Sequence, residues 1–156
     1  MRPARTPIGL HLTQASRAIS RAFDDALAAA GGSLPVWLVV LNLKTRSPSN
    51  QRELAEAVGI REATLTHHLN AMEAGGLISR RRDPANRRIH VVELTDAGEA
   101  TFVSMREAAV AFDRQLRRGI SDQEMAGLGD LLSRLAANVG ADQGGVPWAG
   151  LAEDKP

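Results

Sequence analysis

The 156-residue chain is 44% hydrophobic and 24% charged, a length and composition typical of one globular domain rather than of a disordered or fibrous protein. It has no cysteine and no apolar run near the roughly 20 residues of a membrane helix. These absences argue against disulfides, thiolate metal sites and a membrane partner, and we expect a cytoplasmic protein. The net charge of +1 is uneven, because residues 1–90 carry 13 basic and 7 acidic side chains whereas residues 91–156 carry 6 and 11. The first part of the chain is therefore better suited to bind a polyanion.

Two helices are predicted in the first 45 residues. Over residues 10–30 the apolar positions recur at spacings of seven, four and four, which is the stripe of an amphipathic helix, and the glycine pair at its end stops it. Residues 36–43 are almost wholly apolar, so periodicity alone fits a buried helix or a buried strand. Pro35 suits the first turn of a helix and favours that interpretation.

A helix-turn-helix is predicted next. Residues 50–58 and 61–74 each place apolar side chains on one helical face, and a short turn containing glycine joins them. The opposite face of the second helix presents residues with the chemistry of DNA contacts: Arg61, Thr64, Thr66, His67 and Asn70. Threonine methyls can meet thymine methyls, asparagine can pair bidentately with adenine, and arginine can reach guanine or phosphate. An ordinary solvated surface is the alternative for each of these positions.

The neighbouring histidines His67 and His68 invite the question of a metal site. Adjacent helical residues point about 100° apart and do not share a chelating face, whereas metal-binding helices space their histidines at i and i+4. We therefore predict no metal and no cofactor. His68 lies beside the apolar stripe and is expected to be a packed or half-buried structural residue.

A basic β-hairpin follows the second glycine pair. The hydrophobic period changes to two over residues 78–94, and Asp, Pro and Asn at residues 83–86 indicate the turn. Five arginines fall within nine residues, opposed only by Asp83: Arg80, Arg81, Arg82, Arg87 and Arg88. Guanidinium groups bind phosphate bidentately and enter narrow A·T-rich minor grooves. Because alternate strand residues face opposite sides, only part of the cluster can face DNA, and a solvated charged hairpin is the alternative.

Two further helices and a tail are predicted after the hairpin. Thr95 can cap a helix of about 22 residues, and Ser121 with Glu124 has the pattern of a capping box for a last helix. The apolar residues of that last helix alternate spacings of three and four up to Val139, a seam that needs a partner helix. Residues 139–156 contain glycine and proline without periodicity and predict a flexible tail, and residues 1–9 predict a flexible N-terminus.

Motifs of catalysis are absent from the sequence. It contains no paired catalytic carboxylates, nucleophile elbow, phosphate loop or dinucleotide fingerprint. The glycine pairs follow predicted helices, where they act as stops, and the acidic residues are scattered along helical exteriors. We predict that the protein is not an enzyme.

The order of helices around the hairpin resembles the MarR family of transcriptional regulators, as does the run DPANRR at residues 83–88 leading into VELTDAG at 92–98. The resemblance covers residues 10–138. It implies a mainly helical fold with a small β-hairpin: a winged helix-turn-helix over 33–98, with dimerisation helices over 10–32 and 100–138. It also implies a ligand-responsive repressor, which binds a pseudo-palindromic operator in double-stranded DNA as a homodimer.

The same resemblance assigns roles to single residues. Thr64, Thr66 and His67 would face the major groove, Arg87 at the wing tip would enter the minor groove, and Asp83 would hold that tip by pairing with a wing arginine. The remaining wing arginines would contact phosphates or hold the shape of the wing: Arg80, Arg81, Arg82 and Arg88. The chain departs from the family at two places, since Arg61 stands where Ser or Thr often opens the recognition helix and an arginine frequent at the site of His67 is absent. The base preference therefore stays open.

Family members commonly release DNA when a small, often anionic aromatic ligand binds between the dimer helices and the winged domain. By resemblance a phenolic effector would bind near four residues: Leu12, Arg17, Trp37 and Leu41. Plain core packing is the favoured alternative for Trp37. The alternative for the whole protein is a winged-helix module that binds a protein or small molecule without operator recognition.

Overall fold

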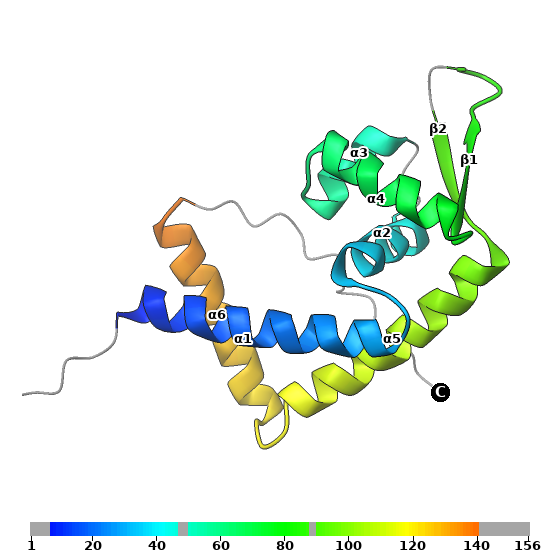
Figure 1. Cartoon of the computed structure of the whole chain (residues 1–156). Helices are drawn as coiled ribbons and strands as arrows, with labels where there is room; N and C mark the ends of the chain where they lie inside the picture. Colours follow the sequence, from blue (N-terminus) through cyan, green and yellow to red (C-terminus); the bar gives the residue numbers. More distant parts are fainter. Residues whose placement is uncertain (1–6, 47–49, 88–89, 141–156) are drawn as a thin grey trace, which may run out of the picture.

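The computed structural model describes residues 7–46, 50–87 and 90–140, and in these ranges it contains six helices and one antiparallel hairpin (Figure 1). The predicted fold class is confirmed. The elements, in chain order, are α1 (Ile8–Ala29), α2 (Leu34–Thr45), α3 (Gln51–Val58), α4 (Glu62–Ala74), β1 (Ile78–Arg82), β2 (His90–Leu94), α5 (Asp96–Leu116) and α6 (Asp122–Asn138). Among the described residues no single helix is long and apolar enough to cross a membrane, and α1 and α2 meet that test only together, across a bend of 76°.

The structure differs from the prediction near the N-terminus, where the first helix begins earlier than expected. Helix α1 begins at Ile8, inside the segment predicted to be a flexible N-terminus, and the N–H groups of Leu10 and His11 donate to the carbonyl of Pro7. A proline carbonyl can accept the first helical hydrogen bonds although its own nitrogen has no proton to donate, so the helix starts earlier than its apolar stripe. Residues 1–6 and 141–156 of the predicted flexible segments lie outside the described residues.

Helix α2 forms the centre of the core, which resolves the ambiguity of its apolar sequence in favour of a helix. Its residues Trp37, Val39, Val40, Leu41 and Asn42 are buried, as expected for a helix that is apolar all round. The open N–H groups of its first turn find acceptors, because the N–H of Leu34 donates to Asp24 of α1 (3.0 Å) and that of Val36 to the hydroxyl of Ser33 (3.5 Å). Helix α1 thus holds the start of α2 in place.

Helix α5 connects the hairpin with the rest of the molecule. Its Phe102 stacks on Trp37 of α2 with ring centroids 5.9 Å apart, and its Phe112 packs on Phe23 of α1 at 5.1 Å. At the edge of this aromatic contact, Lys44 pairs with Glu99 (3.0 Å) and its ammonium lies 5.7 Å from the centroid of the Phe102 ring. Helix α5 therefore packs along the core and carries the chain away from the hairpin (Figure 1).

The base of the hairpin is fixed by Thr95, the residue that caps α5. Its hydroxyl accepts from the N–H of Gly98 (3.1 Å) and donates to the carbonyl of Gly76 (2.5 Å), and its own N–H donates to the carbonyl of Leu77 (3.1 Å). Gly98 is buried against this turn, so that a Cβ at residue 98 would overlap the Leu77 carbonyl and touch the Leu94 side chain. The contacts of Thr95 and Gly98 therefore fix the end of α4, the end of β2 and the start of α5.

We predict that Gly98→Ala lowers the free energy of unfolding by about 1–3 kcal/mol, because the added methyl group forces the backbone at Leu77 to shift. Glu107→Ala, an exposed position on the same helix, is the control and should change stability by less than about 0.5 kcal/mol. Urea denaturation followed by circular dichroism measures both. Equal stability of Gly98→Ala and the wild type would show that Gly98 is not tightly packed against Leu77 and Leu94.

Helix α6 lies at the far end of α5 and contributes nothing to the core. Its predicted capping box is confirmed, since Ser121 and Glu124 exchange side chain to backbone hydrogen bonds, yet none of its residues is buried. Its apolar side chains are exposed together with those at the end of α5: Leu116, Ile120, Leu128, Leu131, Leu132 and Val139. Most helical stability in proteins comes from packing an apolar face, and within the described residues the apolar face of α6 is left exposed.

Candidate nucleic-acid interface

The helix-turn-helix is formed by α3 and α4, which share a small apolar contact. Asn50 caps α3 by accepting from the N–H of Glu53 (2.9 Å), and Gly59 ends it in the left-handed region at a φ of 77°. The buried side chains Leu54, Leu65 and Leu69 hold the two helices against α2. This packing fixes the apolar side of α4 and turns its other side to solvent.

All five residues that the sequence predicted as contacts on this helix are exposed, namely Arg61, Thr64, Thr66, His67 and Asn70. Arg61 is the N-cap residue, so its side chain lies at the amino end of α4. The hydroxyl of Thr66 donates to the carbonyl of Glu62 (2.9 Å), which leaves its methyl group and its oxygen lone pairs to face a ligand. The structure brings these polar side chains onto one solvent-facing surface.

The two histidines of α4 differ in burial, and His68 is half-buried as expected. His67 is exposed and His68 is half-buried, and their rings meet edge to face at 5.8 Å. Within residues 7–46, 50–87 and 90–140 no three His, Asp or Glu side chains are placed to hold a metal ion. The pair is therefore a ring contact on the helix surface.

The hairpin separates its arginines between two faces. In the register of the strands Arg80 lies opposite Val92 and Arg81 opposite Val91, so alternation gives the two arginines different sides. Arg81 pairs across the strands with Glu93 through two hydrogen bonds of 2.8 and 3.1 Å. These hydrogen bonds and the attraction between the two charges lower the pKa of Glu93 from its ordinary value. The same interactions raise the pKa of Arg81.

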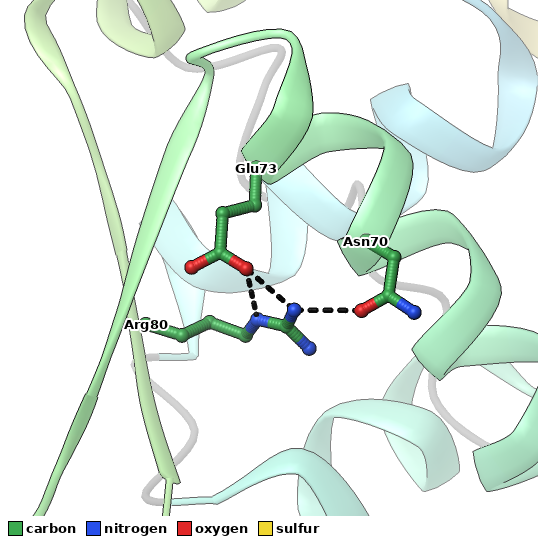
Figure 2. Close-up of polar contacts among 3 residues, drawn as sticks. All are labelled: Asn70, Glu73 and Arg80. Atoms are coloured by element: carbon green, nitrogen blue, oxygen red, sulfur yellow. Dashed lines mark hydrogen bonds and ion pairs between the residues drawn. The ribbon is translucent and has the colours of Figure 1, made fainter.

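Arg80 points the other way, toward α4. It bonds Glu73 and Asn70, as Figure 2 shows, and its side chain is 19% exposed. Glu73 was missed by sequence reasoning, which assigned α4 residues by their chemistry toward DNA and passed over a carboxylate. The available signal was its spacing: Glu73 follows Asn70 by three residues and therefore shares its helix face.

The tip of the hairpin carries exposed arginines on a tight turn. Asp83 accepts from the N–H of Ala85 (2.7 Å), an Asx turn that shapes the tip through the backbone. Arg82 and Arg87 are exposed on either side of it. Arg88 lies outside the described residues, and the pairing of Asp83 with a wing arginine stays a prediction.

The four residues predicted to line an effector site differ in their exposure. Trp37 and Leu41 are buried, Leu12 is half-buried and Arg17 is exposed. A hollow of about 560 Å³ lies between α2, β2 and α5, where Lys44, Glu93 and Glu99 are among its lining residues. The effector site therefore stays a prediction.

Comparison with known proteins connects this geometry to transcription factors. Residues 33–90 match the model of a protein family described as the MarR family. An uncharacterized HTH-type transcriptional regulator of Bacillus subtilis, YdgJ, is 34% identical over 90 residues, which cover 58% of this chain and 55% of that regulator, so the chain spans little more than half of this relative. The crystal structure of transcriptional regulator PA3341 is 31% identical, with a TM-score of 0.70 over 86% of this chain and 98% of that chain.

More distant structures share the fold. A mutant MarR from E. coli complexed with operator DNA is 19% identical, with a TM-score of 0.74 over 83% of this chain and 93% of that chain. The RdhR-CbdbA1625 transcriptional regulator in its 2,4-dichlorophenol bound form is also 19% identical, with a TM-score of 0.74 over 88% of this chain and 89% of that chain. At this identity the likeness concerns the fold.

We predict that the Glu93 carboxyl titrates below its ordinary pKa of 4.5 in the wild type and returns toward it in Arg81→Ala. The stabilisation from the pair is fully present above pH 4.5, the ordinary value, and is lost as the pH falls through the lowered pKa. Carboxyl-carbon NMR during an acid titration measures the shift. Arg82→Ala is the matched control and leaves Glu93 unchanged, whereas identical titrations of wild type and Arg81→Ala would rule out the pair.

Proposed function

This chain belongs to the MarR family of transcriptional regulators, and we propose that it is a sequence-specific regulator that binds double-stranded DNA in the cytoplasm as a homodimer. Membership of this family agrees with the prediction that the protein is not an enzyme. The observation that carries the proposal is the adjacency of two surfaces: the exposed polar face of α4 and the arginine-bearing hairpin, which Arg80 joins to that helix.

In the proposed complex the two surfaces bind neighbouring grooves of one duplex. Helix α4 enters the major groove, where Thr64, Thr66 and His67 contact base edges while Arg61 reaches phosphate or guanine. The hairpin lies along the adjacent backbone, and Arg87 at its tip enters the minor groove. Arg82 and Arg88 then contact phosphates. The structure of a mutant MarR with operator DNA, which shares this fold, supports such a placement.

A second copy of the chain is the proposed partner of α6. The exposed apolar residues of this helix continue the exposed end of α5, and the N-terminal part of α1 exposes Ile8, Leu10 and Ile19 as well. Two copies joined at these helices would bury the apolar surface and present two copies of α4. A dimer with its recognition helices about one DNA turn, roughly 34 Å, apart binds a pseudo-palindromic operator.

We further propose that the protein is a repressor released by a small aromatic or phenolic effector. The support is the 2,4-dichlorophenol bound form of a regulator with the same fold. The residues proposed to line the site, Leu12, Arg17, Trp37 and Leu41, belong to α1 and α2. In a dimer these helices would lie between the α6 helices and the winged domains, so the cleft would be completed by the second copy.

The wing assignment predicts that Arg87→Ala weakens operator binding at least tenfold and reduces the slope of log affinity against log salt by about one, because one phosphate-neutralising cation is lost. Fluorescence anisotropy at several salt concentrations measures both quantities. Arg114→Ala removes an exposed arginine from the last turn of α5 and serves as the control. Unchanged affinity and slope in Arg87→Ala would contradict the assignment.

The dimer predicts that Leu132→Glu converts a particle of twice the 16.7 kDa chain mass into monomers and abolishes cooperative operator binding, since a charge cannot be buried unpaired in an apolar interface. Sedimentation velocity measures the mass. Gln123→Glu adds the same charge nine residues earlier, on the opposite side of α6, and should leave the dimer intact. A monomeric wild type would refute the dimer.

A dimer that fails to retard the gene's upstream DNA even at low salt would favour the alternative of a winged-helix module for protein or small-molecule binding.

A further inference from the structure

Arg80 lies where the hairpin meets helix α4, and its side-chain hydrogen bonds are with residues of that helix. Its Nε and Nη2 atoms donate to Oε2 of Glu73 at 2.9 and 2.5 Å, and Nη2 also donates to Oδ1 of Asn70 at 2.6 Å (Figure 2). With 19% of its side chain exposed, it is more enclosed than Arg81, which is 53% exposed in its own ion pair. The contact joins two elements that meet DNA in the proposed complex.

The alternation of the strand explains why this arginine faces the helix. Arg80 shares its side of β1 with Ile78 and stands opposite Val92, and both of these residues belong to the buried core. Asn70 and Glu73 lie three residues apart on α4 and so present their side chains to the same place. The guanidinium therefore extends from the core-facing side of the hairpin onto the edge of the exposed face of α4.

The ion pair changes the electrostatics of the proposed DNA surface. Glu73 is a carboxylate on the helix that would enter the major groove, where an unpaired negative charge repels phosphate. Arg80 neutralises it and commits three of its five N–H donors, on Nε and Nη2, to α4. Neither side chain then adds to the net attraction of DNA.

The same contact restricts what Asn70 can read. A guanidinium only donates hydrogen bonds, so the amide atom facing Arg80 is the oxygen, and the amide nitrogen points away from it (Figure 2). Bidentate pairing with adenine uses the oxygen and the nitrogen of asparagine together. Arg80 takes one of the two lone pairs of this oxygen and holds the amide in one orientation, so Asn70 can meet bases or phosphate only from that orientation.

We propose that Arg80 is a positioning residue, which fixes the wing against the recognition helix through Glu73 and Asn70, and that it does not neutralise a phosphate. This proposal rests on the proposed DNA-binding function. It makes Glu73 a residue required for DNA binding in spite of its charge, and it excludes Arg80 from the phosphate contacts that the charge cluster suggests.

The sign of the effect of Glu73→Ala tests the proposal. If Glu73 were only a negative charge near DNA, its removal would tighten binding; as the partner of Arg80, its removal weakens binding about tenfold. Glu62→Ala removes the same charge from an exposed position on the same helix and is the control, expected to tighten binding or leave it unchanged. Tighter binding by Glu73→Ala in fluorescence anisotropy overturns the proposal.

The salt dependence and a double variant complete the DNA-binding test. Arg80→Ala weakens binding about tenfold with the salt slope of the wild type, whereas a phosphate contact would lower that slope by about one. The double variant Arg80→Ala/Glu73→Ala binds no more weakly than either single variant, because both remove the same interaction. A lowered slope in Arg80→Ala, or additive losses in the double variant, contradicts the positioning role.

Hydrogen exchange in the free protein tests the contact without DNA. Glu73→Ala and Arg80→Ala speed the exchange of amides in β1 and β2, because the hairpin loses its contact with α4. The amides of α5 keep their wild-type rates, because this helix takes no part in that contact. Unchanged hairpin exchange in both variants overturns the proposal. If the wild type binds no DNA even at low salt, the proposed function fails, and the exchange rates still decide whether Arg80 holds the wing.

Discussion

Helix α2 is apolar on every side, and its burial determines how the other elements are arranged. Helix α2 has no polar face to turn to solvent, so other elements must enclose it, and α1, α3, α4, α5 and β2 all pack against it. This enclosure places the helix-turn-helix on one side of α2 and the long helices on the other. The exposed face of α4 and the direction of the hairpin follow from it, because both elements must present their apolar sides inward.

The alternation of side chains along β1 divides the positive charge of the hairpin between two faces. Five arginines close in sequence look equivalent, yet the residues of β1 alternate between a face that meets α4 and a face that meets Glu93. Arg80 and Arg81 are each neutralised by a carboxylate, which leaves the uncompensated charge of the described wing nearer its tip, at Arg82 and Arg87. The arginines that stabilise the hairpin are thus distinct from those that stay exposed near its tip, and one carboxylate of α4, Glu73, is used to pair with Arg80.

Local rules predicted most of the fold, because helix periodicity, glycine stops and caps act within a few residues of sequence. They predicted the helix-turn-helix, the hairpin, the cap at Thr95 and the capping box at Ser121, and they placed the exposed face of α4 correctly. Local rules were less informative where a contact between distant residues decides the structure. Periodicity allowed a helix or a strand over residues 36–43, and the elements packed around α2 favour the helix. The role of Glu73 depends on Arg80 seven residues away on another element. The burial of Trp37 depends on its contact with Phe102 of α5, which lies 65 residues away in the sequence.

In the proposed complex two copies of the chain, joined through α6, place two recognition helices and two wings on one face of a duplex. Hydroxyl-radical footprinting of the protein on the upstream region of its own gene tests this most directly, since the radical reports protection of each sugar. We expect two symmetric protected segments about one helical turn apart, with protected minor grooves where the wing tips enter. A single protected segment, or no protection at low salt, would contradict it.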